Sequence, residues 1–152
     1  SGKMQEFVST GDLIVVSAAV RDEGTALQYM PMAFPAVADL DVVACLRQAC
    51  QDRAVSYHVG ISHSKDSFYG EVEPHRMPLS DRLAERWQAW IQGGVLCSEM
   101  EAGALFVLAR VLRKRAGGLM VTHGSHGGLE PLCQTAVEGV RLLIELDQKM
   151  GT

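Results

Sequence analysis

An almost unbroken apolar run, residues 11–20, constrains the fold more than any other part of this sequence. Its centre, Leu13-Ile14-Val15-Val16, is apolar at every position and rich in β-branched residues. A strand that faces solvent on one side alternates between apolar and polar residues, whereas a strand covered on both sides does not. The run therefore predicts a central strand of an α/β sheet with helices on both faces.

The segments that follow alternate between helical and strand patterns. Apolar spacing predicts helices at 39–53, 81–92, 102–115 and 131–150, and strands at 55–62, 95–98 and 118–122, with 65–79 irregular. Asp39 and Ser80 are the expected helix N-caps, and Arg113-Lys114-Arg115 is expected to end its helix, where positive charge complements the dipole. This order predicts one α/β domain over residues 1–152, with three layers and a mixed or parallel β-sheet flanked by helices.

Charge and cysteine usage exclude several classes of protein. The formal net charge of -4 gives no electrostatic reason to expect nucleic acid or an anionic membrane as a partner. No apolar run approaches the roughly 20 residues that span a bilayer, and no secretory signal follows Ser1, so we expect a cytoplasmic protein. Cys45, Cys50, Cys97 and Cys133 form no C-x-x-C pair, which favours buried, reduced thiols.

Ser98-Glu99-Met100-Glu101 is the first candidate site, because it follows a predicted strand and opens an apolar helix. In α/β sheets, ligands bind at the carboxyl ends of strands. A carboxylate accepts two hydrogen bonds from neighbouring hydroxyls, so either acid is suited to the vicinal diol of a ribose. The same acids are also favoured in the first turn of a helix that binds nothing, and spacing alone favours that second interpretation.

A second candidate, Lys65-Asp66-Ser67-Phe68-Tyr69-Gly70, also follows a predicted strand. An aromatic pair at the edge of a loop can stack on a flat ring, with Gly70 as a hinge. The alternative is that Phe68 closes the core beneath the loop. The residue types leave both interpretations open.

Taken in order, these segments resemble the uridine phosphorylases of the nucleoside phosphorylase superfamily over nearly the whole chain. Glu-Met-Glu alone is shared with purine phosphorylases and related nucleosidases, whereas its combination with Phe-Tyr-Gly and Phe-Pro-Ala-Val-Ala is more specific for the uridine branch. The segments that carry the resemblance are Gly11-Asp12-Leu13-Ile14-Val15, Ala19-Val20-Arg21-Asp22-Glu23-Gly24-Thr25, Phe34-Pro35-Ala36-Val37-Ala38-Asp39, Asp66-Ser67-Phe68-Tyr69-Gly70 and Ser98-Glu99-Met100-Glu101-Ala102.

The resemblance implies an enzyme with a phosphorylase-like fold that catalyses reversible phosphorolysis of uridine to uracil and ribose 1-phosphate in pyrimidine salvage. It implies phosphate as a co-substrate, no metal or other cofactor, and a homo-oligomer, in this family a hexamer built of dimers. Two rival functions remain open: a non-catalytic nucleoside-binding remnant of the fold, and a nucleoside hydrolase that uses water in place of phosphate.

The resemblance also implies roles for individual residues. Glu101 is expected to bind the ribose 2′- and 3′-hydroxyls, Met100 to pack on the sugar, and Phe68 to stack on uracil. Ser1 and Gly2 are similar to the end of the family's Gly-rich loop beneath ribose and base. The catalytic pair is expected to be Met100 and Glu101, and the full substrate-binding set Ser1, Gly2, Phe68, Glu71, Arg76, Glu99, Met100 and Glu101.

The sequence also departs from the family pattern. It begins inside the Gly-rich loop, so we expect the family's phosphate-binding segment, Gly-Asp-Pro-x-Arg, to be missing and the chain to be incomplete for catalysis. Arg21 is expected to be a turn residue, and the basic cluster at 113–115 a solvated helix end, rather than phosphate ligands. Together these expectations describe a C-terminal part of the family's domain.

The base-binding positions depart from the pattern as well. Glu71 stands where a Gln is common, and Arg76 is a weak candidate for the missing hydrogen-bond donor. An ionised Glu only accepts hydrogen bonds and would repel a departing uracil anion. His123 and His126 stand near the position where purine-specific relatives carry Ser-Asp, and the missing Asp disfavours a purine. We expect no metal at this His pair.

Overall fold

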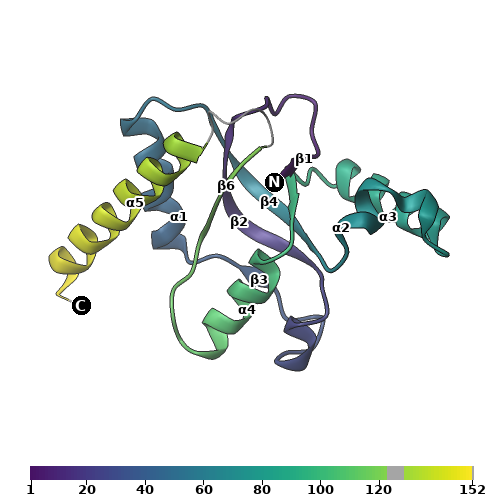
Figure 1. Ribbon diagram of the computed structural model, residues 1–152. Helices are drawn as coiled ribbons and strands as arrows, with labels where there is room; N and C mark the ends of the chain where they lie inside the picture. The colour runs from purple at the N-terminus through teal and green to yellow at the C-terminus, as the bar shows by residue number, and fades with distance from the viewer. Residues whose placement is uncertain (123–128, 152) are drawn as a thin grey trace.

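The computed structural model describes residues 1–122 and 129–151, and contains one mixed β-sheet (Figure 1). The strand order is β1-β5-β4-β2-β3, and β6 pairs with β2 beside β3. The strands β2, β4 and β5 are parallel to one another, whereas β1, β3 and β6 run antiparallel to their partners. The strands are β1 (Gly2–Lys3), β2 (Leu13–Asp22), β3 (Ala36–Val37), β4 (Tyr57–Lys65), β5 (Cys97–Glu99) and β6 (Gly118–Val121).

Helices cover both faces of this sheet, so the predicted α/β fold with a mixed sheet is confirmed. The helices α1 and α5 lie against each other, α4 packs on β2 and β3, and α3 lies to one side beyond α2 (Figure 1). The bounds are α1 (Leu40–Asp52), α2 (Phe68–Val72), α3 (Ser80–Gln92), α4 (Ala102–Val111) and α5 (Leu129–Met150), with 3₁₀ turns η1 (Ala26–Gln28) and η2 (Pro74–Arg76).

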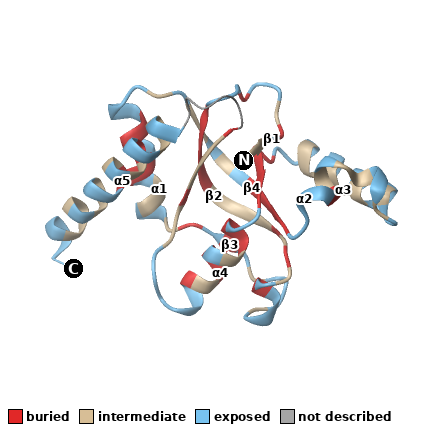
Figure 2. Ribbon diagram, in the orientation of Figure 1, coloured by how far each residue is buried: buried red, intermediate tan, exposed pale blue. Residues whose placement is uncertain are grey.

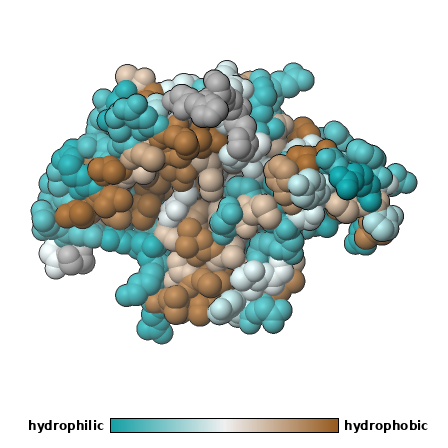
Figure 3. All heavy atoms as spheres, viewed as in Figure 1, coloured by the Kyte–Doolittle hydropathy of each residue, from teal (hydrophilic) through white to brown (hydrophobic). Residues whose placement is uncertain are grey.

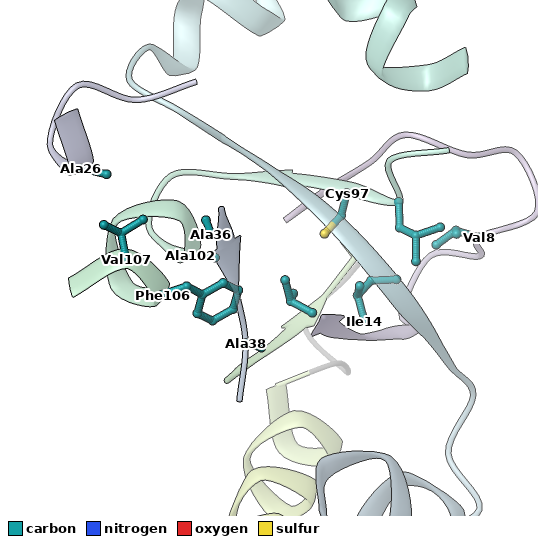
Figure 4. Close-up of a cluster of buried hydrophobic side chains, with 11 residues drawn as sticks. Val8, Ile14, Ala26, Ala36, Ala38, Cys97, Ala102, Phe106 and Val107 are labelled. Atoms are coloured by element: carbon teal, nitrogen blue, oxygen red, sulfur yellow. The ribbon is translucent and has the colours of Figure 1, made fainter. Parts of the chain in front are cut away.

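The apolar run lies in β2 at the centre of the sheet, where Leu13, Ile14, Val15 and Val16 are all buried. Ile14 and Val16 belong to the core cluster that contains Phe106 of α4 (Figure 4). Leu13 and Val15 belong to a second cluster with Leu46 and Cys50 of α1. Because successive side chains of a strand point to opposite faces, an unbroken run supplies both cores. Figure 2 shows this burial along the central strands.

Helix ends agree only partly with the sequence-based predictions. Asp39 caps α1 as expected, since its carboxylate accepts hydrogen bonds from the backbone N–H groups of Asp41 and Val42 at 3.1 and 3.3 Å. The prediction for Ser80 was wrong: Ser80 is the first residue of α3, and no side chain caps that helix. The stretch expected to be irregular contains α2 and η2.

The basic cluster at 113–115 lies beyond the end of α4, so the predicted helix was four residues too long. Arg113 has a φ of 53°, a left-handed conformation that stops the helix. The guanidinium of Arg115 instead donates two hydrogen bonds to Asp147 of α5, at 2.9 and 2.5 Å. Arg115 therefore ties the segment between α4 and β6 to α5.

Arg21 is a buried residue of β2 and not the turn residue that the sequence suggested. Its guanidinium donates hydrogen bonds to the carbonyl oxygens of Met30 at 3.0 Å, Pro31 at 2.7 Å and Met32 at 3.2 Å, and also to that of Phe34. These bonds hold the connection between β2 and β3 against the sheet. Both terminal nitrogens of the guanidinium are thus engaged by backbone carbonyl oxygens.

The four cysteines are free thiols, of which Cys45, Cys50 and Cys97 are buried as predicted. Cys133 is exposed on α5, contrary to the prediction. Burial raises the pKa of Cys50 and of Cys97 to about 11, which keeps both thiols protonated and unreactive near neutral pH. Within the described chain, no helix is both long and apolar enough to cross a membrane.

Candidate functional site

The carboxyl ends of β4 and β5 meet at one edge of the sheet, where His63 is paired with Ser98 and Ser64 with Glu99. On the other side of β5, the short strand β1 runs antiparallel and places Gly2 opposite Ser98. The structure thus brings together two segments of the predicted site that are almost a hundred residues apart in the sequence. Ser1 also lies here, with its hydroxyl donating to the carbonyl oxygen of Val121 at 3.0 Å.

The two acids of the Glu-Met-Glu sequence have different surroundings. Glu99 is buried. One carboxylate oxygen accepts hydrogen bonds from the hydroxyls of Ser62, at 2.9 Å, and Ser64. The other accepts from the backbone N–H groups of Glu101 and Ala102, at 2.6 and 2.7 Å. Four donors use the full acceptor capacity of a carboxylate. Glu99 therefore ties both strands to the start of α4.

Glu101 is exposed, and its carboxylate accepts one hydrogen bond within the described chain, from the backbone N–H of Met100 at 3.1 Å. Met100 beside it is 38% exposed. The helix start therefore presents one carboxylate with unused acceptor positions next to an apolar side chain. This arrangement suits a polyhydroxylated ligand with one apolar face.

Glu71 lies beside the same strand ends and is paired with Lys65, a residue to which the sequence pattern assigns no role of its own. The ammonium of Lys65, at the end of β4, lies 2.6 Å from Glu71 Oε2 and 2.6 Å from Ser98 Oγ. The hydroxyl of Ser98 in turn donates to Glu71 Oε2 at 2.5 Å. We call Lys65, Glu71 and Ser98 the strand-end triad. Its position at the carboxyl end of a parallel strand was the signal that could have identified Lys65.

The remaining predicted residues lie farther out. Phe68 is 51% exposed on α2, with its ring edge-on to Tyr69 at a centroid distance of 5.5 Å, so it does not close the core. Arg76 lies on the exposed turn η2 and is ion-paired with Glu73. The structure does not bring Arg76 into contact with the strand-end triad.

A cavity of about 290 Å³ opens between α2, α3 and the ends of β2 and β4. Lys65 and Glu71 line its polar side, and Leu83, Trp87 and Trp90 of α3 are among its apolar walls. The indole Nε1 of Trp90 is buried and has no hydrogen-bond partner among the described residues. This volume is at the lower end of the range for small-molecule sites. Of the predicted substrate-binding set, Glu71 alone lines this cavity, together with Lys65, Asp66, Ser67 and Gly70 of the second candidate segment.

Asp22 connects α3 to the sheet at the same cavity. Its carboxylate lies 2.9 Å from Nε2 of His63 on β4 and is also paired with Arg86 of α3. Burial opposes ionisation of Asp22, but the hydrogen bond with His63 and the charge of Arg86 outweigh it and hold the pKa below its ordinary value. Because α3 has no buried residue, this ionic contact is an important attachment of the helix.

Within the described residues, no group of three or more His, Cys, Asp or Glu side chains is arranged to hold a metal ion. His123 and His126, the pair considered from the sequence, lie outside the described residues.

The sequence model of the Phosphorylase superfamily matches residues 1–141. The chain belongs to the phosphorylase superfamily. This confirms the resemblance inferred from the Glu-Met-Glu and Phe-Tyr-Gly segments.

Curated members of the superfamily are similar to this chain along most of its length. The uridine phosphorylase of Treponema pallidum is 40% identical over 159 residues, covering 97% of this chain and 62% of that protein. The uridine phosphorylase of Thermococcus kodakarensis is 35% identical, covering 98% and 57%. A guanosine phosphorylase of Halorubrum lacusprofundi is 34% identical over 124 residues, covering 82% and 47%. The chain spans about 60% of the length of the uridine phosphorylases described here.

Replacing Glu99 by Gln is expected to destabilise the fold. The NH₂ group of the Gln amide would face hydroxyl or backbone N–H groups that donate hydrogen bonds to Glu99. We expect the free energy of unfolding to fall by about 2–3 kcal/mol, measured by urea denaturation. Glu101→Gln, two residues away and exposed, is the matched control, with a change below about 0.5 kcal/mol. Equal effects of the two substitutions would contradict the different environments described for these acids.

The attachment of α3 through Asp22 is expected to weaken in acid. Because the folded-state pKa is lowered, the contribution of Asp22 is fully present above the unfolded pKa of about 3.9 and is lost as pH falls through the folded value. Urea denaturation at several values between pH 7 and pH 3 should show wild type losing its stability advantage over Asp22→Asn as pH falls. An advantage that grows on acidification would contradict this, and Asp81→Asn on α3 controls for loss of a carboxylate.

Proposed function

We propose that this chain forms the ribose- and base-binding part of a uridine phosphorylase, which converts uridine and phosphate reversibly to uracil and ribose 1-phosphate. The observation that carries the proposal is the pairing of β1 with β5, with Gly2 opposite Ser98. This pairing places the Ser1-Gly2 segment beside the strand end that leads to Met100 and Glu101. The uridine phosphorylases among its relatives support the same substrate.

In this proposal, the accessible carboxylate of Glu101 accepts hydrogen bonds from the ribose 2′- and 3′-hydroxyls, and Met100 packs against the sugar. A phosphate oxygen attacks C1′, the bond from C1′ to N1 of uracil breaks, and its electron pair leaves with the base. Positive charge that develops on the ribose is stabilised by the nearby carboxylate. Phe68 stacks on the base from α2, and Ser1, Gly2 and Glu71 border it.

Glu99 has a positioning role in this proposal, because its oxygens are already used within the chain. Arg21 binds carbonyl oxygens and Arg86 pairs with Asp22, so neither is assigned to phosphate. We assign phosphate binding to residues outside these 152, in keeping with the share of the relatives' length that the chain spans.

We also propose a cytoplasmic homo-oligomer whose substrates are small molecules. Large apolar side chains are exposed on α5, among them Val137 at 72%, Val140 at 56% and Ile144 at 53%. Figure 3 shows apolar surface over α1 and α5 and over α4. Contiguous apolar surface of this kind is typical of an interface between subunits.

Incubating a protein that carries both this chain and the phosphate-binding residues assigned outside it with uridine, with and without phosphate, tests the proposed function. Uracil release that requires phosphate is the expected result. Release without phosphate would indicate a hydrolase, and uridine binding without turnover would indicate a non-catalytic binding protein. Glu101→Gln is expected to lower kcat/KM by roughly 100-fold, since charge-assisted hydrogen bonds to the diol are lost. Glu145→Gln on α5 is the control.

A further inference from the structure

We propose that Lys65 and Glu71 together recognise the amide edge of the base. As an ion pair they supply the hydrogen-bond donor and acceptor that a single Gln side chain would supply alone. The inference rests on the proposed function and names the base-recognition residues of that same site. An ionised Glu71 without a cation beside it would repel a leaving uracil anion.

The charge problem is removed by the contact between the two side chains. The ammonium of Lys65 lies 2.6 Å from Glu71 Oε2, and the two side chains are only 9% and 14% exposed. A carboxylate that is so little hydrated interacts strongly with the cation beside it. The pair therefore offers a base no net negative charge, and the ammonium is in place to stabilise an anion.

The hydrogen bonds inside the strand-end triad leave one donor and one acceptor free. An ammonium has three N–H groups. Two of those on Lys65 are used by Ser98 Oγ and Glu71 Oε2, and the third is free within the described chain. Glu71 Oε2 accepts from Lys65 and Ser98, whereas no described residue donates a hydrogen bond to Glu71 Oε1. Both free groups belong to residues that line the cavity of about 290 Å³.

Gly2 keeps the free oxygen of Glu71 accessible. A side chain at this position would place its Cβ 3.4 Å from Glu71 Oε1, in ordinary contact and in the way of a ligand. Because Gly2 is paired with Ser98, the free oxygen lies beside the strand end that leads to Glu101. The ribose and base contacts thus share one edge of the sheet.

Uracil presents an N3–H donor between two carbonyl acceptors, the complement of this arrangement. Glu71 Oε1 accepts from N3–H, and the free N–H of Lys65 donates to the adjacent carbonyl oxygen. When the bond from C1′ to N1 breaks, the electron pair is shared with the carbonyl oxygens of uracil, and the ammonium stabilises that charge. Cytosine has a lone pair at N3, which would face the carboxylate and be repelled.

The test compares uridine with 3-methyluridine, in which a methyl group replaces the N3 proton. Wild type should prefer uridine by roughly 100-fold or more in kcat/KM, because a buried acceptor is left unpaired by the methylated substrate. Lys65→Met should lower kcat/KM for uridine by roughly 100-fold, and Lys65→Arg, which keeps the charge, should recover part of it. Lys149→Met on α5 controls for loss of a lysine charge.

The double variant Lys65→Met/Glu71→Met removes the risk that an unpaired buried carboxylate simply unfolds the protein. It should remain folded by circular dichroism and lose the preference for uridine over 3-methyluridine. A folded double variant that keeps the preference overturns the proposal, as does a greater loss from Arg76→Ala than from Lys65→Met.

Binding of the free bases separates this inference from the proposed function. If wild type with its phosphate-binding residues present releases no uracil, the proposed function fails, yet calorimetric titration with uracil and 3-methyluracil still tests the ion pair. Tighter binding of uracil that disappears in the double variant supports base recognition by Lys65 and Glu71. Equal binding of the two bases by wild type overturns it.

Discussion

The buried carboxylate of Glu99 is the interaction on which the arrangement of the site depends. A carboxylate removed from water must have its oxygens satisfied, and here two serine hydroxyls of β4 and two backbone N–H groups of α4 provide this. Ser64 reinforces the junction, since its hydroxyl also accepts from the backbone N–H of Gly103 at 2.7 Å. The geometry of β4, β5 and the start of α4 is thereby fixed, and with it the position from which Met100 and Glu101 reach a ligand.

A second set of charged contacts, buried at Lys65 and His63 and partly exposed at Asp22 and Arg86, shapes the neighbouring edge. Lys65 and Glu71 join α2 to the end of β4, and Asp22 joins α3 to β2 and β4 through His63 and Arg86. Buried ion pairs are weak contributors to stability, because desolvation offsets their attraction. Their value here is positional, since they hold the short helix α2 and the poorly buried helix α3 against a cavity.

The sequence predicts the fold well where one strong physical pattern decides it. The unbroken apolar run of β2 requires cover on both faces, and the structure supplies it from α4 and from α1. Prediction fails where the answer depends on three-dimensional contacts: spacing does not reveal that Glu99 is buried beneath Ser62 and Ser64 whereas Glu101 is exposed. The candidate segment included Lys65 but gave it no role, because its partners, Glu71 and Ser98, meet it only after strand pairing. The helix predicted at 102–115 is too long because it rests on local helix propensity, which does not reveal the left-handed conformation of Arg113.

A crystal structure of the protein with uridine bound tests the central claim most directly. The account predicts the ribose 2′- and 3′-hydroxyls within hydrogen-bond distance of Glu101, while Glu99 keeps its four bonds to β4 and α4. It also predicts the N3 edge of uracil against Lys65 and Glu71. A ribose held by Glu99, or a uridine bound away from the edge formed by β1, β5 and β4, would contradict it.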